Sequence, residues 1–419
     1  MLVGAACTTG GTSISATRST LATTTTTSPP RGNLDGVLRI GALLPTTGAG
    51  ATLGASLLAG LQLAKAEINQ AGGVNGQEVE LVVADEAGDP ALASVALERM
   101  VEQDLVDAVV GPVSTRVTLS LLGELTSAGI ISCSPTNTAA SLSDYPDQGY
   151  YFRTAPPDSL QAVALGRSIA ETGAKSAAIL FVDDDYGRSI TEGLVNELRR
   201  QGTEVTGRVS IDPTAASYEA DLQEMLDQEP EAIAFAGVAD PGVRVLAALH
   251  DLGVRPDRVP VFVSDGMRMI DLGAALGAAE SAAAAGVRGL SMAPSLASAG
   301  WFRDALAAAG STAPNLYAAY AYDCANLIAL GAQSLGTDDP ALVRSALPSV
   351  SKGGVPCQNF PTCVVPLETG RGRNIDLDGA SGPLELSTEG DPEWGTFDQF
   401  RFDETGRSTT EGQLPVRST

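Results

Sequence analysis

The segment GPVST at 111–115 places two hydroxyl side chains directly after a predicted strand and at the start of a predicted helix. Backbone N–H groups at a helix start have no partner within the helix, and the helix dipole favours negative charge there. Ser114 and Thr115 add hydroxyl donors to the same turn. The pattern predicts an anion-binding turn, and the alternative is ordinary helix capping by the same two side chains.

Two further segments carry polar groups in similar positions. SPTNTA at 134–139 is a Pro-containing turn that exposes the Thr136 backbone and the Thr138 hydroxyl. VFVSDGMR at 261–268 places Asp265 at the end of a predicted strand and directly before a glycine. A buried carboxylate is costly unless it is paired, so Asp265 would need a partner if it is buried at this strand end. The alternatives are a structural turn at 134–139 and an Asx turn at Asp265.

Strands and helices alternate along most of the chain, and this alternation decides where the three segments lie. Apolar runs predict strands at 38–44, 79–84, 107–110, 129–132, 177–182, 204–209, 231–236, 260–264 and 287–292. Helical spacing predicts helices at 52–71, 89–104, 115–127, 158–173, 187–201, 217–228, 240–252, 298–309 and 317–335. The order predicts an α/β fold of two doubly wound, Rossmann-like lobes, in which ligands bind at the carboxyl ends of strands.

The lobe boundaries follow from breaks in this alternation. The two prolines of YYFRTAPP at 150–157 mark the first crossing, and the low-complexity AAAAGVRG near 284–290 marks the return. From residue 340 onward the helical pattern stops, which predicts turns, short strands, a third crossing and an edge hairpin. We therefore expect lobe 1 at 37–155 plus 289–370 and lobe 2 at 156–288 plus 371–415.

Three lesser candidates for ligand contact lie close to the expected cleft. Leu53 falls on the rim of the first lobe, and Tyr151 and Tyr186 fall near the lobe junction. The alternatives are that Tyr151 packs at the hinge and that Tyr186 simply begins a helix.

The first 36 residues differ in composition from the rest of the chain. MLVGAAC resembles a bacterial lipobox, with Gly4 where Leu is usual, so Cys7 is a candidate for lipidation. We expect the true signal to begin upstream of the chain's first residue, and a diacyl group on Cys7 to anchor the protein outside a cell membrane. The Thr-rich segment at 8–36 has too little apolar surface for a core and would act as a disordered spacer of roughly 30 Å. The alternative is a disordered N-terminus without lipid.

Charge and composition exclude several classes of function. The 419 residues include 26 basic and 50 acidic side chains, a net charge of −24, which argues against nucleic acid as a partner. GAGATLG suggests a dinucleotide fingerprint, but Leu53 stands where its third glycine belongs. The only histidine is His250, on an apolar helix, so an enzyme with histidine or multi-His metal chemistry is poorly supported. Asp376 and Asp378 lack the later acidic ligands of a calcium loop, so we expect no metal or cofactor.

Four cysteines follow Cys7. Cys357 and Cys363 flank a short Pro-bounded loop, and in an exported protein that spacing favours a disulfide over free thiols or a metal site. Cys133 and Cys324 lie in apolar contexts, where a bond and two buried free thiols are equally compatible with the sequence.

Several segments together resemble a known family. The chain resembles type I periplasmic binding proteins of the branched-chain amino acid group of ABC importers, as an actinobacterial-type lipoprotein. The matching segments are IGALLPTTGAGATLGASLLAGLQLAKAEINQAGGVNGQEVELVVADEAGDP, VDAVVGPVST, AGIISCSPTNTAASL, YYFRTAPPD, AAILFVDDDYGRS and GPLELSTEGDP, spread over residues 38–392. The resemblance implies two lobes joined by a three-stranded hinge, a ligand in the cleft, and delivery of a small amino acid to a membrane permease.

The resemblance also implies roles for particular residues. Thr115 takes the place of a serine that binds the ligand carboxylate, and the turn at 134–139 serves both carboxylate and amino group. Asp265 stands where the family places an acid against the ligand ammonium. The chain departs from the pattern at Ala239, where relatives carry an aromatic, and at Gly88 and Ser114, where leucine-type proteins carry a disulfide. We therefore expect a small zwitterion or an amide-like solute rather than leucine specifically, and the alternative function is a sensor ectodomain of the same fold.

Overall fold

The structure is a computed structural model that describes most of the chain. The described residues are Met1, Leu2, Gly4, 34–268, 272–277, 281–313, Asn315, 317–369 and 374–418. Contacts divide the chain into a short unit, Met1–Gly32, and a second unit, Asn33–Thr419, which holds all the elements below. Cys7, the candidate for lipidation, lies outside the described residues. Within the described ranges, no helix combines the length and apolar content needed to cross a bilayer.

The first lobe is built on a parallel five-stranded sheet in the order β2-β1-β3-β4-β5. Its strands are β1 (Arg39–Leu44), β2 (Glu80–Asp85), β3 (Ala108–Val110), β4 (Ile131–Ser134) and β5 (Tyr151–Arg153). The helices between them are α1 (Ala51–Gln70), α2 (Pro90–Glu102) and α3 (Thr115–Ala128). The strand order reverses at β1, as the doubly wound prediction requires. Among these five strands, β5, which is three residues long, is the one that the sequence did not predict.

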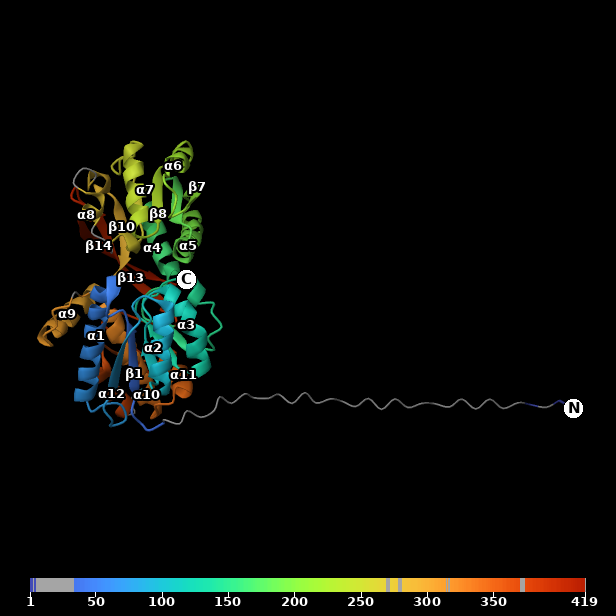
Figure 1. The fold of residues 1–419 in the computed structure, drawn as a ribbon, viewed down its shortest axis with the longest axis vertical. Coiled ribbons are helices and arrows are strands. Elements are labelled where there is room, and N and C mark those ends of the chain that lie inside the picture. The colour runs from blue at the N-terminus through green and yellow to red at the C-terminus, as the bar shows by residue number, and fades with distance from the viewer. Residues whose placement is uncertain are drawn as a thin grey trace. The chain divides into compact units, whose positions relative to one another are not determined.

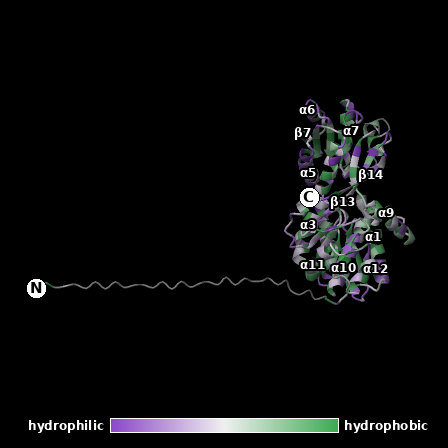
Figure 2. Cartoon of the chain, turned by 180° about the vertical axis from the view of Figure 1, so that it is seen from behind, coloured by the Kyte–Doolittle hydropathy of each residue, from purple (hydrophilic) through white to green (hydrophobic). Residues whose placement is uncertain are grey.

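The second lobe is built on a seven-stranded sheet in the order β14-β13-β10-β9-β8-β6-β7. Its strands are β6 (Ser176–Val182), β7 (Glu204–Ile211), β8 (Ala232–Ala236), β9 (Val261–Val263), β10 (Arg288–Met292), β13 (Trp394–Phe402) and β14 (Ser408–Arg417). Its helices are α4 (Asp158–Ala170), α5 (Asp185–Gln201), α6 (Glu219–Leu226), α7 (Ala239–Asp251) and α8 (Leu272–Leu276). β13 and β14 form an antiparallel hairpin at the sheet edge, which confirms the predicted hairpin. In Figure 2, α5 and α7 each carry hydrophilic and hydrophobic stretches, as helices covering one face of a sheet do.

The prediction that helices end near residue 340 was wrong. After α9 (Leu296–Ala308) and α10 (Ala318–Leu335), the chain forms α11 (Pro340–Val350) and α12 (Phe360–Glu368). Asp339 caps α11 by accepting from Ala341 N at 2.9 Å, and Asn359 forms a capping box at α12. Both helices are short and contain an internal proline, which masked their spacing in the sequence. A two-stranded sheet of β11 (Val355–Cys357) and β12 (Ile375–Leu377) completes this region.

The structure also differs from the expected lobe boundaries. β10 pairs with β9 and β13, so the return crossing follows Met292 rather than residue 289. Ile375, Leu377, Leu384 and Leu386 are buried in the core of the first lobe, so that lobe continues well beyond residue 370. The chain then crosses a third time at 391–394 and enters β13, which lies at the junction between the lobes in Figure 1. The low-complexity stretch misled the prediction because it precedes a strand of the second sheet.

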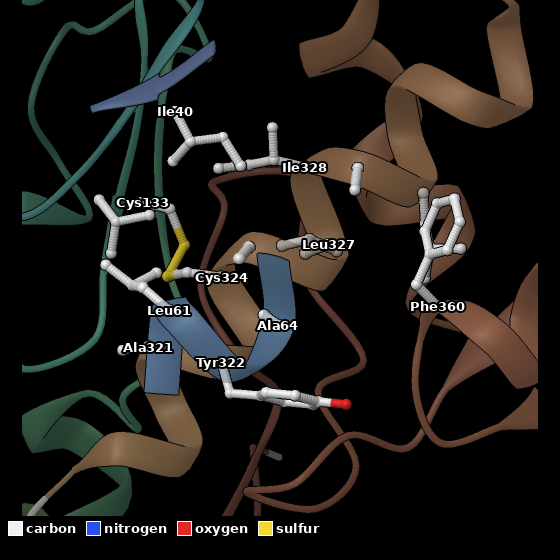
Figure 3. Packing of buried hydrophobic residues seen from close by; sticks show 14 of the residues in the cluster. Ile40, Leu61, Ala64, Cys133, Ala321, Tyr322, Cys324, Leu327, Ile328 and Phe360 are labelled. Atoms are coloured by element: carbon white, nitrogen blue, oxygen red, sulfur yellow. A yellow bond between two sulfur atoms is a disulfide. The ribbon is translucent and has the colours of Figure 1, made fainter. Parts of the chain in front are cut away.

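The two cysteine pairs are both disulfides. Cys357–Cys363 closes the short loop as predicted, and Cys133–Cys324 links two segments 191 residues apart. Both sulfurs of the long-range bond are fully buried, and Figure 3 shows the bond among Leu61, Ile40 and other side chains of the first-lobe core. This bond ties β4 to α10, so the alternative of two free thiols does not hold.

Candidate functional site

Asp265 and Tyr186 form a hydrogen-bonded pair at the carboxyl end of the second sheet. Asp265 begins a 3-10 turn (Asp265–Met267) directly after β9, and it is only 5% exposed. Tyr186 lies in the first turn of α5, and its hydroxyl donates to Asp265 Oδ1. Burial raises the pKa of Asp265, although Tyr186 and Gln161 oppose the rise. The structure thus brings two predicted site residues together, and their contact with a ligand stays a prediction.

A second carboxylate, Asp158, lies close enough to Asp265 for their charges to interact. It is the first residue of α4 and is fully buried. No described residue donates a hydrogen bond of normal geometry to either of its carboxylate oxygens. Burial raises the pKa of Asp158 to about 7, the Thr138 hydroxyl opposes the rise, and the charge of Asp265 adds to it. Sequence reasoning missed Asp158 because an acid after two prolines at a helix start is also typical of a simple helix terminus.

Gln161 and Tyr317 add further polar groups near Asp265. Gln161 lies one turn along α4 from Asp158, and its Oε1 is buried without a partner among the described residues. Tyr317, just before α10, is half-buried, and its pKa is raised by burial and by the charge of Asp265. The second lobe therefore gathers two buried carboxylates and an unpaired amide oxygen, which together suit a hydrogen-bonding cation.

The turn at 134–139 supplies the first lobe's contribution, directly after β4. The Thr136 hydroxyl donates to Val113 O at 2.7 Å, and so it is already used within the lobe. Thr138 is buried at 9% exposure, its carbonyl accepts from Asp158 N at 2.8 Å, and its hydroxyl lies beside the Asp158 carboxylate. The predicted Thr138 hydroxyl therefore lies against a carboxylate of the second lobe.

The start of α3 follows the predicted pattern, with part of it used for capping. Ser114 is the N-cap, and its hydroxyl accepts from Val117 N at 3.3 Å. Behind it, Val113 N donates to both carboxylate oxygens of Glu86 at 3.3 Å, and burial raises the pKa of Glu86 to about 7. Thr115 is the first residue of the helix and is half-buried. Capping thus accounts for Ser114, while anion binding at this helix start stays a prediction.

Tyr151 and Leu53, the two lesser candidates on the first lobe, both pack against apolar side chains of that lobe. Tyr151 on β5 is 1% exposed and packs against Leu122 and Leu142 inside the first lobe. Burial raises the pKa of its phenol to about 12. The strand directs this side chain into the lobe interior, so the structure gives no support to Tyr151 as a ligand contact. Leu53 lies in the first turn of α1, half-buried against the first-lobe core.

A direct contact joins the two lobes beside this cluster. Ala140 N, after the turn at 134–139, donates to Ser189 Oγ on α5 at 3.2 Å. Ser189 also lies close enough to Asp158 to oppose the rise of its pKa. The hydroxyl-rich turn of one lobe therefore adjoins the carboxylates of the other, at the carboxyl ends of strands in both sheets.

The fold has two doubly wound lobes joined by three crossings, and polar groups gather between the facing strand ends. This arrangement defines the class of two-lobed binding proteins. The chain belongs to the periplasmic binding protein family, whose model matches residues 37–359.

Similar proteins include a chemotactic signal transduction system substrate-binding protein, BasB, of Halobacterium salinarum, 26% identical over 89% of this chain and 88% of that protein. An amino acid binding protein of Pseudomonas aeruginosa is 27% identical over 74% of this chain and 82% of its own length. Among solved structures, a Streptococcus pneumoniae branched-chain amino acid binding protein, LivJ, in complex with isoleucine has a TM-score of 0.68 at 22% identity, covering 91% of this chain and 99% of that one. At that identity the structural likeness shows the fold alone.

Proposed function

We propose that this protein is an extracytoplasmic solute receptor that closes on a small amino acid and delivers it to an ABC importer. The observation that carries the proposal is the pair of buried carboxylates, Asp158 and Asp265, on the lobe that faces the hydroxyl-rich turn. Two buried acids at one place are costly unless a cation or protons neutralise them. A ligand ammonium would supply that charge and donate hydrogen bonds to Asp158 oxygens that lack one.

The opposite end of the ligand would lie against the first lobe. The start of α3 offers N–H groups and a helix dipole to a carboxylate or amide oxygen, and Thr115 adds a hydroxyl, while Thr136 N already donates to Ser134 Oγ at 3.3 Å. In this arrangement the cationic end of the ligand contacts the second lobe and the anionic end contacts the first. A zwitterion bridges the lobes, and its binding therefore favours their closure.

The relatives support this class of ligand. Leu/Ile/Val-binding protein homologues of Brucella species are about a quarter identical to the chain, and a Desulfitobacterium hafniense substrate-binding protein in complex with Leu shares the fold with a TM-score of 0.70. Neither fact specifies this chain's ligand side chain. An amide-like solute remains within the proposal, because an amide oxygen can replace the carboxylate.

The test is a thermal-shift screen of residues 34–419 against single amino acids, short amides, urea and aromatic acids. A ligand that binds only the folded state raises the melting temperature by mass action. We expect a shift with one or a few small zwitterions, and no shift with acids that lack an ammonium group. No shift with any amino acid or amide would contradict the proposal.

A second candidate is a sensor that passes ligand state to a signalling partner, favoured by the likeness to BasB. The two functions differ in their membrane partner. Stimulation of ATP hydrolysis by a reconstituted permease complex, on addition of the liganded protein, would support transport. Binding to a receptor kinase or transducer without such stimulation would support sensing.

We also place the protein at the outer face of the cell membrane. The motif ending at Cys7 and the Thr-rich segment after it support a lipid anchor followed by a spacer.

A further inference from the structure

Arg153, the last residue of β5, makes a buried ion pair with the third interlobe crossing. Its side chain is fully buried, Nε donates to Asp391 Oδ1 at 2.6 Å, and Nη2 donates to Asp391 Oδ2 at 3.0 Å. Ser143 joins the pair, because its hydroxyl accepts from Nη2 at 2.7 Å and donates to Asp391 Oδ2 at 2.6 Å. This two-point contact fixes the plane of the guanidinium group.

The remaining guanidinium nitrogen contacts the turn at 134–139. Arg153 Nη1 donates to Ala139 O at 2.9 Å and to Asn137 O at 3.4 Å. These carbonyls flank Thr138, the residue whose hydroxyl lies beside Asp158. One planar group therefore contacts both Asp391 and the backbone on either side of a predicted ligand-binding threonine.

The backbone of the first interlobe crossing holds the same turn. Thr154 N donates to Ser134 O at 3.1 Å, and Asp158 N donates to Thr138 O at 2.8 Å. Arg153 N in turn donates to Gly390 O at 3.0 Å, which brings the first and third crossings together. A Cβ on Gly390 would lie 2.4 Å from Tyr151 O, so the two crossings pack with no room for a side chain there. The turn, β5 and the third crossing thus form one connected unit.

Hinge motion between lobes requires the backbone of the crossings to change, and the contacts above connect that change to the turn. Because the guanidinium group is rigid and planar, a displacement of Asp391 moves the hydrogen bonds to Asn137 O and Ala139 O. We propose that Arg153 is a positioning residue that couples the third interlobe crossing to the ligand-binding turn at 134–139. This inference rests on the proposed function only in treating that turn as part of the ligand site.

The test uses amide hydrogen exchange in the ligand-free protein, so it does not depend on which solute binds. In Asp391→Asn the charge that holds Arg153 is lost, although among the described residues the hydrogen bonds of Asp391 go to Ser143, Arg153 and Ser387 and not to the turn at 134–139. We expect amides of the turn to exchange about tenfold faster or more, the scale of losing a charge-assisted hydrogen bond. Arg153→Lys should give the same result, because one ammonium group cannot serve Asp391 and both carbonyls at once.

The matched control is Asp398→Asn. Asp398 lies on β13 after the same crossing, is 18% exposed against 15% for Asp391, and pairs with Arg268 at 2.9 Å within the second lobe. The control should leave exchange in the turn unchanged. If Asp391 had a purely structural role, its substitution would speed amide exchange only around residues 385–396, and that result would overturn the inference. The inference would also be overturned if Asp398→Asn sped amide exchange in the turn as much as Asp391→Asn does. Asp391→Glu, which keeps the charge, should restore part of the protection.

A failure of the proposed function would be seen separately. If the turn exchanges faster in Asp391→Asn but the solute screen gives no binder, the coupling stands and the assignment of the turn to a ligand site falls. If a solute binds, but the variants change neither amide exchange in the turn nor the affinity for the solute, then the coupling through Arg153 is rejected and the proposed function stands.

Discussion

The Tyr186 hydroxyl donates a hydrogen bond to Asp265 Oδ1, and the charge of Asp265 in turn acts on Asp158. The three side chains come from the starts of α5 and α4 and from the turn after β9, all in the second lobe. Tyr186 satisfies one oxygen of Asp265, and Gln161 also opposes the rise of that pKa, while the charge of Arg153 opposes the rise of the Asp158 pKa. Neither carboxylate oxygen of Asp158 accepts a hydrogen bond of normal geometry from a described residue, and this shortage of donors has measurable consequences.

Asp265→Ala should lower the affinity for the solute found in the screen by about 10²–10³, because the ligand cation would then be desolvated without its partner. The ligand-free variant should melt at or above the wild-type temperature, since a buried carboxylate has been removed. Calorimetry and thermal unfolding of the same samples give both values. Unchanged affinity would exclude Asp265 as the partner of the cation.

The raised pKa of Asp158 predicts that the free energy of unfolding depends on pH, and one substitution at this residue isolates the effect. Its pKa is about 7 in the folded protein against an ordinary 3.8, so the folded state binds more protons between these values. Stability from this group is present below pH 3.8 and is lost as the pH rises through 7, by up to roughly 4 kcal/mol. Asp158→Asn should thus unfold like the wild type near pH 4 and be the more stable protein at pH 8.

Chemical denaturation of both proteins at several pH values measures this difference. In the wild type, stability should fall as the pH rises from 5 to 8, but affinity for an ammonium ligand should increase over the same range, because Asp158 becomes charged. In Asp158→Asn the tightening should be smaller. Parallel stability curves for the two proteins across this range would contradict the role given to Asp158.

The two disulfides should differ in their effect on stability. In the chain-entropy model, a bond across 191 residues contributes about 5 kcal/mol, while one across 6 residues contributes about 2 kcal/mol. Replacing Cys133 and Cys324 together by Ala should therefore lower the free energy of unfolding far more than replacing Cys357 and Cys363. Ligand affinity should survive the second replacement, and a large loss there would instead place the loop at 357–363 in the site.

Lipidation of Cys7 is testable on native protein. Intact mass of material extracted from membranes should show added acyl mass, and Cys7→Ser should release the protein into the soluble fraction. A native protein with an unmodified Cys7 would remove the anchor from the account.

The sequence predicted the fold well because strand and helix periodicity repeats along the chain, and it failed where periodicity is short or interrupted. α11 and α12 each contain a proline that breaks the pattern while caps at Asp339 and Asn359 still nucleate the helices. β10 was expected near the return crossing but lies within the second sheet, because pairing with a strand about 110 residues later is not visible locally.

The candidate site was only partly predictable for the same reason. Asp265 could be found because it ends a strand and precedes a glycine. Asp158 and Arg153 could not, because their roles depend on burial created when distant segments meet. Tyr151 lies two residues before Arg153 on the same strand, and it packs against Leu122 and Leu142 inside the first lobe.

The most direct test of the central claim is a pair of titrations at pH 7.5, with the amino acid found in the screen and with its analogue lacking the ammonium group. The two carboxylates require a cation, so we predict that the amino acid binds and that the analogue binds at least about a hundredfold more weakly. Equal affinities would show that Asp158 and Asp265 do not recognise the ligand's charge, and the account of the site would be contradicted.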